Sequence, residues 1–181
     1  MAMKTQKPAQ KPKVQKPLVV IVMGSDSDLP IMNETSRMLK ELEIPFEMEI
    51  SSAHRSPGRT ASYAREASGR GIQVIIAGAG GSFHLAGVIA AETNLPVIAV
   101  PIANSPLAGM DALLAAVQMP GGVPVGVMAV GKAGAVNAAI FAAQIIATSD
   151  GKVARRLVRH KQEMAQSVLE KNNRLKKELQ G

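Results

Sequence analysis

The sequence has no cysteine and no tryptophan, and aromatic side chains make up only 2% of its 181 residues. The lack of cysteine excludes thiolate nucleophiles, disulfides and cysteine-bound metals, and it fits a reducing cytoplasm, where we expect the protein. No apolar run approaches the roughly 20 residues that cross a bilayer, and the N-terminus lacks the apolar centre of a signal peptide. We therefore expect no membrane partner. A core must be built from Ala, Val, Ile, Leu and Met.

The net charge of +7 is concentrated at the two ends of the chain. Residues 1–17 contain five lysines and no acid, and residues 151–181 contain nine basic and three acidic residues. Residues 18–150 contain seven basic and eleven acidic residues. A nucleic-acid-binding protein would be expected to gather positive charge on a folded face together with stacking aromatics. This distribution argues against a nucleic-acid partner.

Residues 1–17 form a Lys- and Pro-rich tail that we predict to be disordered. Between residues 18 and 150, short apolar runs alternate with longer amphipathic ones, which predicts a catalytic α/β domain. The predicted strands are 18–23, 46–50, 72–81, 96–101 and 123–130, and the predicted helices are 29–43, 57–70, 84–92, 109–118 and 132–148. Five such units predict a doubly wound three-layer sandwich around a five-stranded parallel sheet, with a flavodoxin-like strand order.

Residues 151–181 have no strand partner and predict an extra long C-terminal helix. An apolar stripe follows one side of it, in pairs offset by eleven residues: Val153 and Leu157, Met164 and Val168, Leu175 and Leu179. That spacing keeps the stripe on one face over about eight turns. We expect either the body of the protein or a neighbouring subunit to cover it, and we expect His160 to lie on a solvated basic face.

Ligands of doubly wound sheets bind beyond the carboxyl ends of the strands. We assign five segments to that edge: "GSDSD" (24–28), "SSAHRSP" (51–57), "GAGGSFH" (78–84), "PIANSP" (101–106) and "QMPGG" (118–122). Two of the three histidines, His54 and His84, fall within these segments. This concentration predicts a site at that edge.

The turn "GSDSD" offers hydroxyls and backbone N–H groups at the start of a helix, which suit a phosphate. Two carboxylates would repel an anion, so we assign Asp28 to ribose hydroxyls and place the Ser25 hydroxyl nearer the phosphate. Plain helix capping by Ser27 or Asp28 is an equal alternative.

In "SSAHRSP", Ser56 followed by Pro57 predicts a helix start, which places His54 and Arg55 in the preceding turn. The guanidinium of Arg55 is suited to a phosphate. Histidine ordinarily titrates at a pKa of about 6.5, so His54 can give or take a proton near neutral pH.

The segment "GAGGSFH" lacks the third glycine of a dinucleotide fingerprint, because Phe83 stands in its place. We interpret it as a bare backbone wall that lets a small ligand approach. His84 either points into the same site or caps the next helix. No metal-ligand spacing and no phosphate-binding "GxxxxGK[ST]" occurs, which disfavours metal chemistry and ATP hydrolysis.

Taken together, "VMGSDSD", "SSAHRSP", "VIIAGAGG", "LPVIAVP" and "QMPGGVPVGVMAVGKAGAVNAA" resemble the 5-(carboxyamino)imidazole ribonucleotide mutase family of purine biosynthesis over residues 18–150. The resemblance implies conversion of 5-(carboxyamino)imidazole ribonucleotide into 4-carboxy-5-aminoimidazole ribonucleotide, with CO2 as a trapped intermediate. It also implies no metal or other cofactor, and a homo-octamer.

Carried over by position, the resemblance makes His54 the catalytic proton carrier. It places Ser25, Asp28, Ser52 and Arg55 on the ribonucleotide. The carboxylate pocket is walled by the backbone-rich segment and the second histidine: Gly78, Ala79, Gly80, Gly81 and His84. The chain departs from the family pattern at Ser82, Phe83 and Ala86, at residues 103–106 and within 111–115, and we expect Phe83 to pack against a neighbouring subunit.

Two alternatives remain. One is a direct aminoimidazole ribonucleotide carboxylase that uses free CO2, a branch of the family that lacks the histidine pattern to which His84 belongs. The other is a nucleotide-binding protein without catalysis, which the departures around Phe83 motivate.

Overall fold

The structure, a computed structural model, describes residues 16–180, so the predicted disorder of the N-terminal tail falls almost entirely outside the described residues. Five parallel strands form one sheet: β1 (Val19–Met23), β2 (Phe46–Ile50), β3 (Val74–Gly80), β4 (Val97–Ile102) and β5 (Gly126–Val127). Their order is β2-β1-β3-β4-β5. This is the flavodoxin-like order, so the prediction is confirmed.

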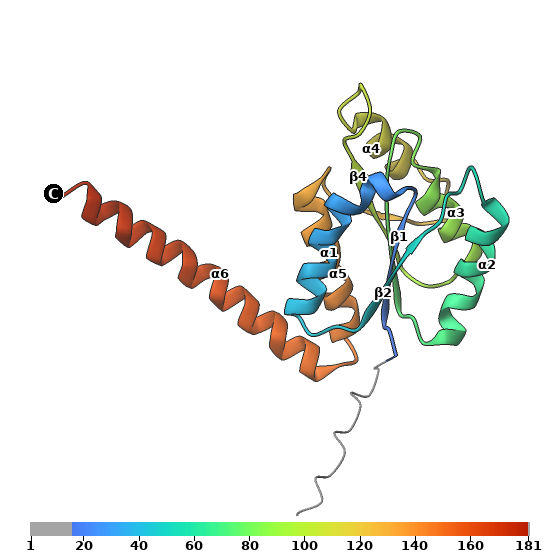
Figure 1. Cartoon of the computed structure of the whole chain (residues 1–181). Helices are drawn as coiled ribbons and strands as arrows, with labels where there is room; N and C mark the ends of the chain where they lie inside the picture. The colour runs from blue at the N-terminus through green and yellow to red at the C-terminus, as the bar shows by residue number, and fades with distance from the viewer. Residues whose placement is uncertain (1–15, 181) are drawn as a thin grey trace, which may run out of the picture.

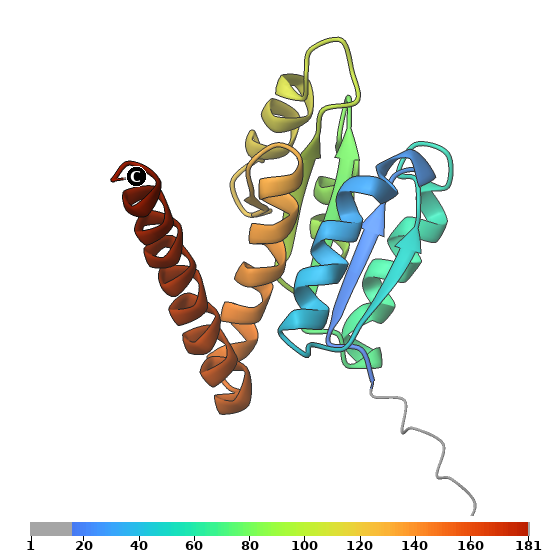
Figure 2. The same cartoon turned by 60° about the vertical axis from the view of Figure 1, so that its left-hand side comes forward.

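Helices cover both faces of the sheet (Figures 1 and 2). One face carries α1 (Leu29–Glu41) and α5 (Lys132–Ala147), and the other carries α2 (Pro57–Ala67), α3 (His84–Glu92) and α4 (Met110–Val117). Alternate strand residues serve the two sides: Ile21 packs under α1 and α5, whereas Val20 and Val22 pack under the other three helices. Because both faces are buried, the central strands are continuously apolar, as the sequence suggested.

Strand β5 is much shorter than the predicted strand 123–130. Only two residue pairs join it to β4, Ile98 with Gly126 and Ala99 with Val127. Proline has no backbone N–H to donate, and Pro124 before β5 and Pro101 on β4 limit the ladder on either side. An apolar run alone does not reveal where such pairing stops.

Helix α6 (Gly151–Glu178) packs on α5 near its start and then projects away from the body (Figure 1). Val153 is buried and Leu157 packs on the core. The rest of the stripe is exposed, at 48% for Met164, 66% for Val168, 53% for Leu175 and 78% for Leu179. The body therefore covers only the first turns, and cover by a neighbouring subunit stays a prediction.

His160 differs from its expected solvated position, because its Nε2 atom is buried in a groove beside Glu41 and Leu42. Over residues 16–180, no helix combines the length and the apolar character that crossing a membrane requires.

Candidate active site

A cleft of about 470 Å³ opens at the carboxyl edge of the sheet, between the turns that follow β1, β2, β3 and β4. It brings together all of the predicted site residues except Gly78. The lining residues are Gly24, Ser25, Asp28, Ser52, Ala53, His54, Arg55, Ala79, Gly80, Gly81, Phe83, His84, Leu85, Asn104 and Ser105.

A larger open hollow of about 930 Å³ lies at the opposite edge, and no histidine lines it. Gly122 of the "QMPGG" segment belongs to this hollow, beside Pro96 and Val97 at the start of β4. For Gly122 the expected position at the carboxyl edge is therefore wrong. Helix α4 carries the chain back toward the amino-terminal edge before β5 begins.

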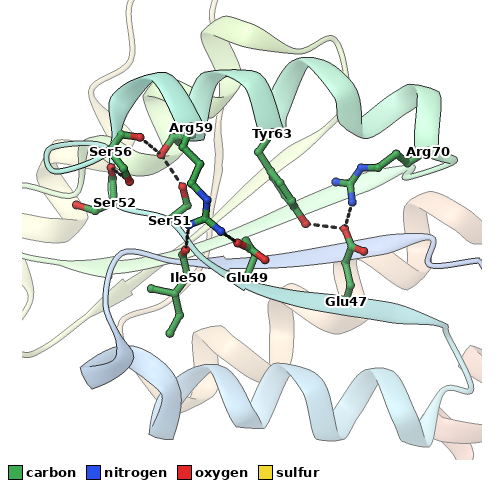
Figure 3. Close-up of polar contacts among 10 residues, drawn as sticks. Glu47, Glu49, Ile50, Ser51, Ser52, Ser56, Arg59, Tyr63 and Arg70 are labelled. Carbon is green, nitrogen blue, oxygen red and sulfur yellow. Dashed lines mark hydrogen bonds and ion pairs between the residues drawn. The ribbon is translucent and has the colours of Figure 1, made fainter.

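The turn that carries His54 is anchored to α2 by a polar network (Figure 3). Arg59 donates to the Ile50 carbonyl at 2.7 Å and pairs with the Glu49 carboxylate. The buried hydroxyls of Ser51 and Thr60 lie 2.7 Å apart. Helix α2 begins at Pro57 as predicted, but the Ser56 hydroxyl makes no cap bond and donates instead to the Ser52 carbonyl at 3.0 Å. This network holds both ends of the turn that carries His54.

His54 and His84 face one another across the cleft, although 30 positions separate them in the sequence. Nε2 of His54 lies 2.6 Å from Nδ1 of His84, and the rings meet edge to face with centroids 4.8 Å apart. At this distance one of the two facing nitrogens donates an N–H and the other accepts it, and the tautomer of each ring decides which one donates. Helix α3 begins at His84 without a side-chain cap bond. Of the two positions expected for the His84 side chain, capping the helix or pointing into the cleft, the structure shows the second.

Asp28 is buried at the base of the first turn, with 2% of its surface exposed. Its Oδ2 atom accepts the backbone N–H of Ser25 at 3.1 Å, and Ser25 is the N-cap of the short 3₁₀ helix η1 (Asp26–Asp28). The Ser25 hydroxyl accepts the backbone N–H of Ser27 at 3.3 Å, so the capping side chains in this turn are those of Ser25 and Asp28. Burial raises the pKa of the Asp28 carboxyl, while backbone hydrogen bonds and Arg55 act in the opposite direction.

Arg55 spans the cleft from the second turn to the first. Its Nη2 donates to the Gly24 carbonyl at 3.2 Å, and its Nε donates to the Ser52 hydroxyl at 3.3 Å. The guanidinium remains exposed, so it can bind an anion at the cleft while its position is held by both turns.

The backbone wall consists of Ala79, Gly80 and Gly81. Gly78 does not line the cleft. An ideal Cβ built on it would stand 2.3 Å from the Sδ of Met32, so the absence of a side chain at Gly78 leaves the space that Met32 fills. Phe83 is 3% exposed and belongs to the core of its own subunit, so the expected packing against a neighbour is wrong. It also has a positive φ of 28°, which marks a strained entry into α3.

Two polar lining residues, Asn104 and Ser105, were missed as site residues. Asn104 donates from Nδ2 to Asp28 Oδ1 at 3.1 Å. Their segment had been assigned to the carboxyl edge, so a signal existed, but no spacing rule singled them out. Among residues 16–180, no three His, Asp or Glu side chains gather closely enough to hold a metal ion.

The AIR carboxylase family matches residues 18–167. The N5-carboxyaminoimidazole ribonucleotide mutase of Bacillus subtilis (strain 168) is 52% identical over 159 residues, covering 88% of this chain and 98% of the relative. The enzyme of the same name from Pyrococcus horikoshii is 50% identical and covers 90% and 91%, respectively. The crystal structure of Treponema denticola PurE superposes with a TM-score of 0.80 at 28% identity, covering 88% of this chain and 99% of that chain. The chain belongs to the AIR carboxylase family.

Proposed function

We propose that this protein is a mutase that converts N5-carboxyaminoimidazole ribonucleotide into 4-carboxy-5-aminoimidazole ribonucleotide in purine biosynthesis. The relatives that share about half of its residues carry the mutase name. The observation that carries the proposal is the His54–His84 contact of 2.6 Å in a cleft walled by backbone. Two hydrogen-bonded imidazoles suit a reaction that moves one proton between two substrate atoms, because each ring can give or take a proton.

The chemistry balances without a net proton. Cleavage of the substrate's C–N bond releases CO2, and the electron pair stays on the exocyclic nitrogen, which takes a proton. Carbon 4 of the imidazole ring then attacks CO2 and forms a C–C bond. Loss of the hydrogen from carbon 4 restores the aromatic ring and returns a proton to the enzyme. In this scheme His54 carries the proton, and His84 relays it across their contact.

The remaining residues hold the two fragments together. Arg55 and Ser25 bind the phosphate, Ser52 fixes the Arg55 guanidinium, and Asp28 accepts hydrogen bonds from ribose hydroxyls. The backbone from Ala79 to Gly81 lets the small carboxylate or CO2 approach without a side chain between them. Anchoring the sugar phosphate keeps the ring within reach of CO2, so recapture at carbon competes with escape.

A direct carboxylase is the second candidate, because the family description itself is AIR carboxylase. Purified protein is assayed with each ribonucleotide in turn. We expect turnover of the carboxyamino isomer without added bicarbonate. Turnover of 5-aminoimidazole ribonucleotide with bicarbonate, and none of the carboxyamino isomer, would assign the protein to the carboxylase instead.

A homo-octamer in the cytoplasm completes the proposal. Apolar side chains on α4 support subunit contacts, because Met110, Leu114 and Val117 are about half exposed, at 52%, 52% and 51%. A phosphorylated substrate does not cross a bilayer unaided, so the enzyme must share the compartment in which that substrate is made. Light scattering on the protein as it elutes from a size-exclusion column should give eight times the mass of one chain.

A further inference from the structure

Asn104 connects the turn after β4 to the turn after β1. Its Nδ2 donates to Asp28 Oδ1 at 3.1 Å, and Asp28 Oδ2 accepts the Ser25 N–H at 3.1 Å. Both oxygens of the Asp28 carboxylate are thus held, one by Asn104, 76 positions away in the sequence, and the other by the turn to which Asp28 itself belongs. This arrangement fixes the direction in which its remaining lone pairs point.

The Asn104 amide also lies against Gly80 of the backbone wall. An ideal Cβ built on Gly80 would stand 1.5 Å from Asn104 Oδ1, so any side chain at position 80 would displace the amide. The Asn104 side chain is exposed and lines the cleft. Within the part of the chain that the structure describes, its bond to Asp28 is its one side-chain hydrogen bond. One amide hydrogen and the carbonyl oxygen therefore remain for a ligand.

We propose that Asn104 is a further substrate-binding residue, and that Asp28 and Asn104 together recognise the ribose hydroxyls. A hydroxyl both donates and accepts, and a sugar diol presents two of them side by side. The Asp28 carboxylate only accepts, whereas the Asn104 amide can donate and accept, so the pair satisfies both functions of the diol. The amide is neutral, which suits a hydroxyl better than the phosphate beside Arg55. This inference rests on the proposed ribonucleotide substrate.

The test compares binding of 5-aminoimidazole ribonucleotide with binding of its 2′-deoxy and 3′-deoxy analogues, measured by calorimetry. The native protein should prefer the ribonucleotide over both analogues. In Asn104→Ala, the Kd for the ribonucleotide should rise about 3- to 10-fold, the effect of one hydrogen bond, while the Kd for at least one deoxy analogue stays unchanged. The preference for that hydroxyl is then lost. KM should rise by the same factor, with kcat nearly constant.

Two further variants separate recognition from mere space filling. Asn104→Asp keeps the shape of the side chain but loses the amide group that donates to Asp28, so it should lose the preference for ribose as Asn104→Ala does. Gly80→Ala should reproduce the loss of ribose preference by displacing Asn104. Its matched control is Gly69→Ala, where an added Cβ meets nothing within 4 Å. Asn94→Ala, an exposed asparagine at the opposite edge, is the control for Asn104→Ala.

The outcomes are distinguishable. If the native protein binds no ribonucleotide, the proposed function fails and with it the basis of this inference. If the native protein binds and Asn104→Ala keeps the full preference for ribose, the inference is wrong. An equal loss for all three ligands in Asn104→Ala would make Asn104 a structural residue only, which also overturns the inference.

Discussion

Replacing His54 tests the proton-transfer assignment most directly. The contact with His84 is made by Nε2, the ring nitrogen farthest from the backbone. An asparagine amide ends near the position of Nδ1 and does not reach His84, whereas a glutamine amide reaches the position of Nε2. His54→Asn therefore removes both the contact and the proton carrier, and His54→Gln removes only the carrier.

The expected effect is large and confined to the chemical step. A positioned general acid or base contributes about 10²- to 10⁴-fold to a rate, which corresponds to about 3–5 kcal/mol of transition-state stabilisation. Both variants should lose that factor in kcat. Their Kd for 5-aminoimidazole ribonucleotide should stay within about 3-fold of the native value, because phosphate and ribose contacts are intact.

The 2.6 Å contact further predicts that the two histidines act as one unit. Residues that share one function show strongly non-additive effects. We expect His84→Asn to reduce kcat less than His54→Asn, and the double variant to be no slower than His54→Asn alone. Steady-state rates with the carboxyamino ribonucleotide, together with calorimetric binding of the aminoimidazole ribonucleotide, measure all of these quantities.

Two results would refute the reasoning. Nearly native kcat in His54→Asn would show that His54 carries no proton in the reaction. A double variant whose loss equals the product of the two single losses would show that the rings act independently despite their contact. His160→Asn is the matched control, since His160 lies in a groove away from the cleft and should leave kcat unchanged.

Three other predictions concern stability. Burial raises the pKa of Asp28 in the folded protein, so ionisation of this carboxyl opposes folding. As the pH rises from 3.8, the unfolding free energy of the native protein should therefore fall relative to that of Asp28→Asn. Urea titrations that show a rise would contradict this prediction. Tyr63 donates to the Glu47 carboxylate (Figure 3), so Tyr63→Phe should cost about 1.5–3 kcal/mol without changing kcat. The pKa of Tyr63 is raised to about 12 in the folded protein, so above pH 10 the phenol ionises first in the unfolded chain. The difference in unfolding free energy between the native protein and Tyr63→Phe should therefore narrow as the pH rises above 10. A constant difference would show that the Tyr63 pKa is not raised by folding. Truncation after Asp150 removes the buried Val153 and the exposed apolar stripe of α6. It should lower the unfolding free energy by at least about 2 kcal/mol and impair assembly. An unchanged melting temperature and an unchanged mass of the assembly would contradict these two expectations.

The strand order and the layers could be predicted because they follow from local patterns. Continuous apolar strands alternating with amphipathic helices require a parallel sheet covered on both faces, and the handedness of the connections leaves few topologies. The length of β5 could not be predicted, because pairing depends on the neighbouring strand as well as on the run itself. Likewise, the position of residues 118–122 depends on where α4 ends, which periodicity does not fix.

The site was predicted in part for the same reason. The carboxyl ends of parallel strands converge, so His54, Arg55, Asp28 and His84 could be assigned to one edge before any contact was known. Which atoms meet there is a matter of three-dimensional packing. The His54–His84 contact joins residues 30 positions apart, and the Asn104–Asp28 bond joins residues 76 positions apart. No spacing rule reports contacts at such separations.

The departures from the family pattern lie both at the cleft and behind it, because Phe83, Asn104 and Ser105 line the cleft whereas Ala86 does not. Phe83 and Ala86 are buried, at 3% and 0% exposure, in the cluster beneath α3. The wall that faces the cleft is backbone from Ala79 to Gly81, and backbone presents the same N–H and C=O groups whatever packs behind it. Phe83 lines the same cleft in which the two imidazoles make their contact, so its presence is compatible with catalysis as well as with binding.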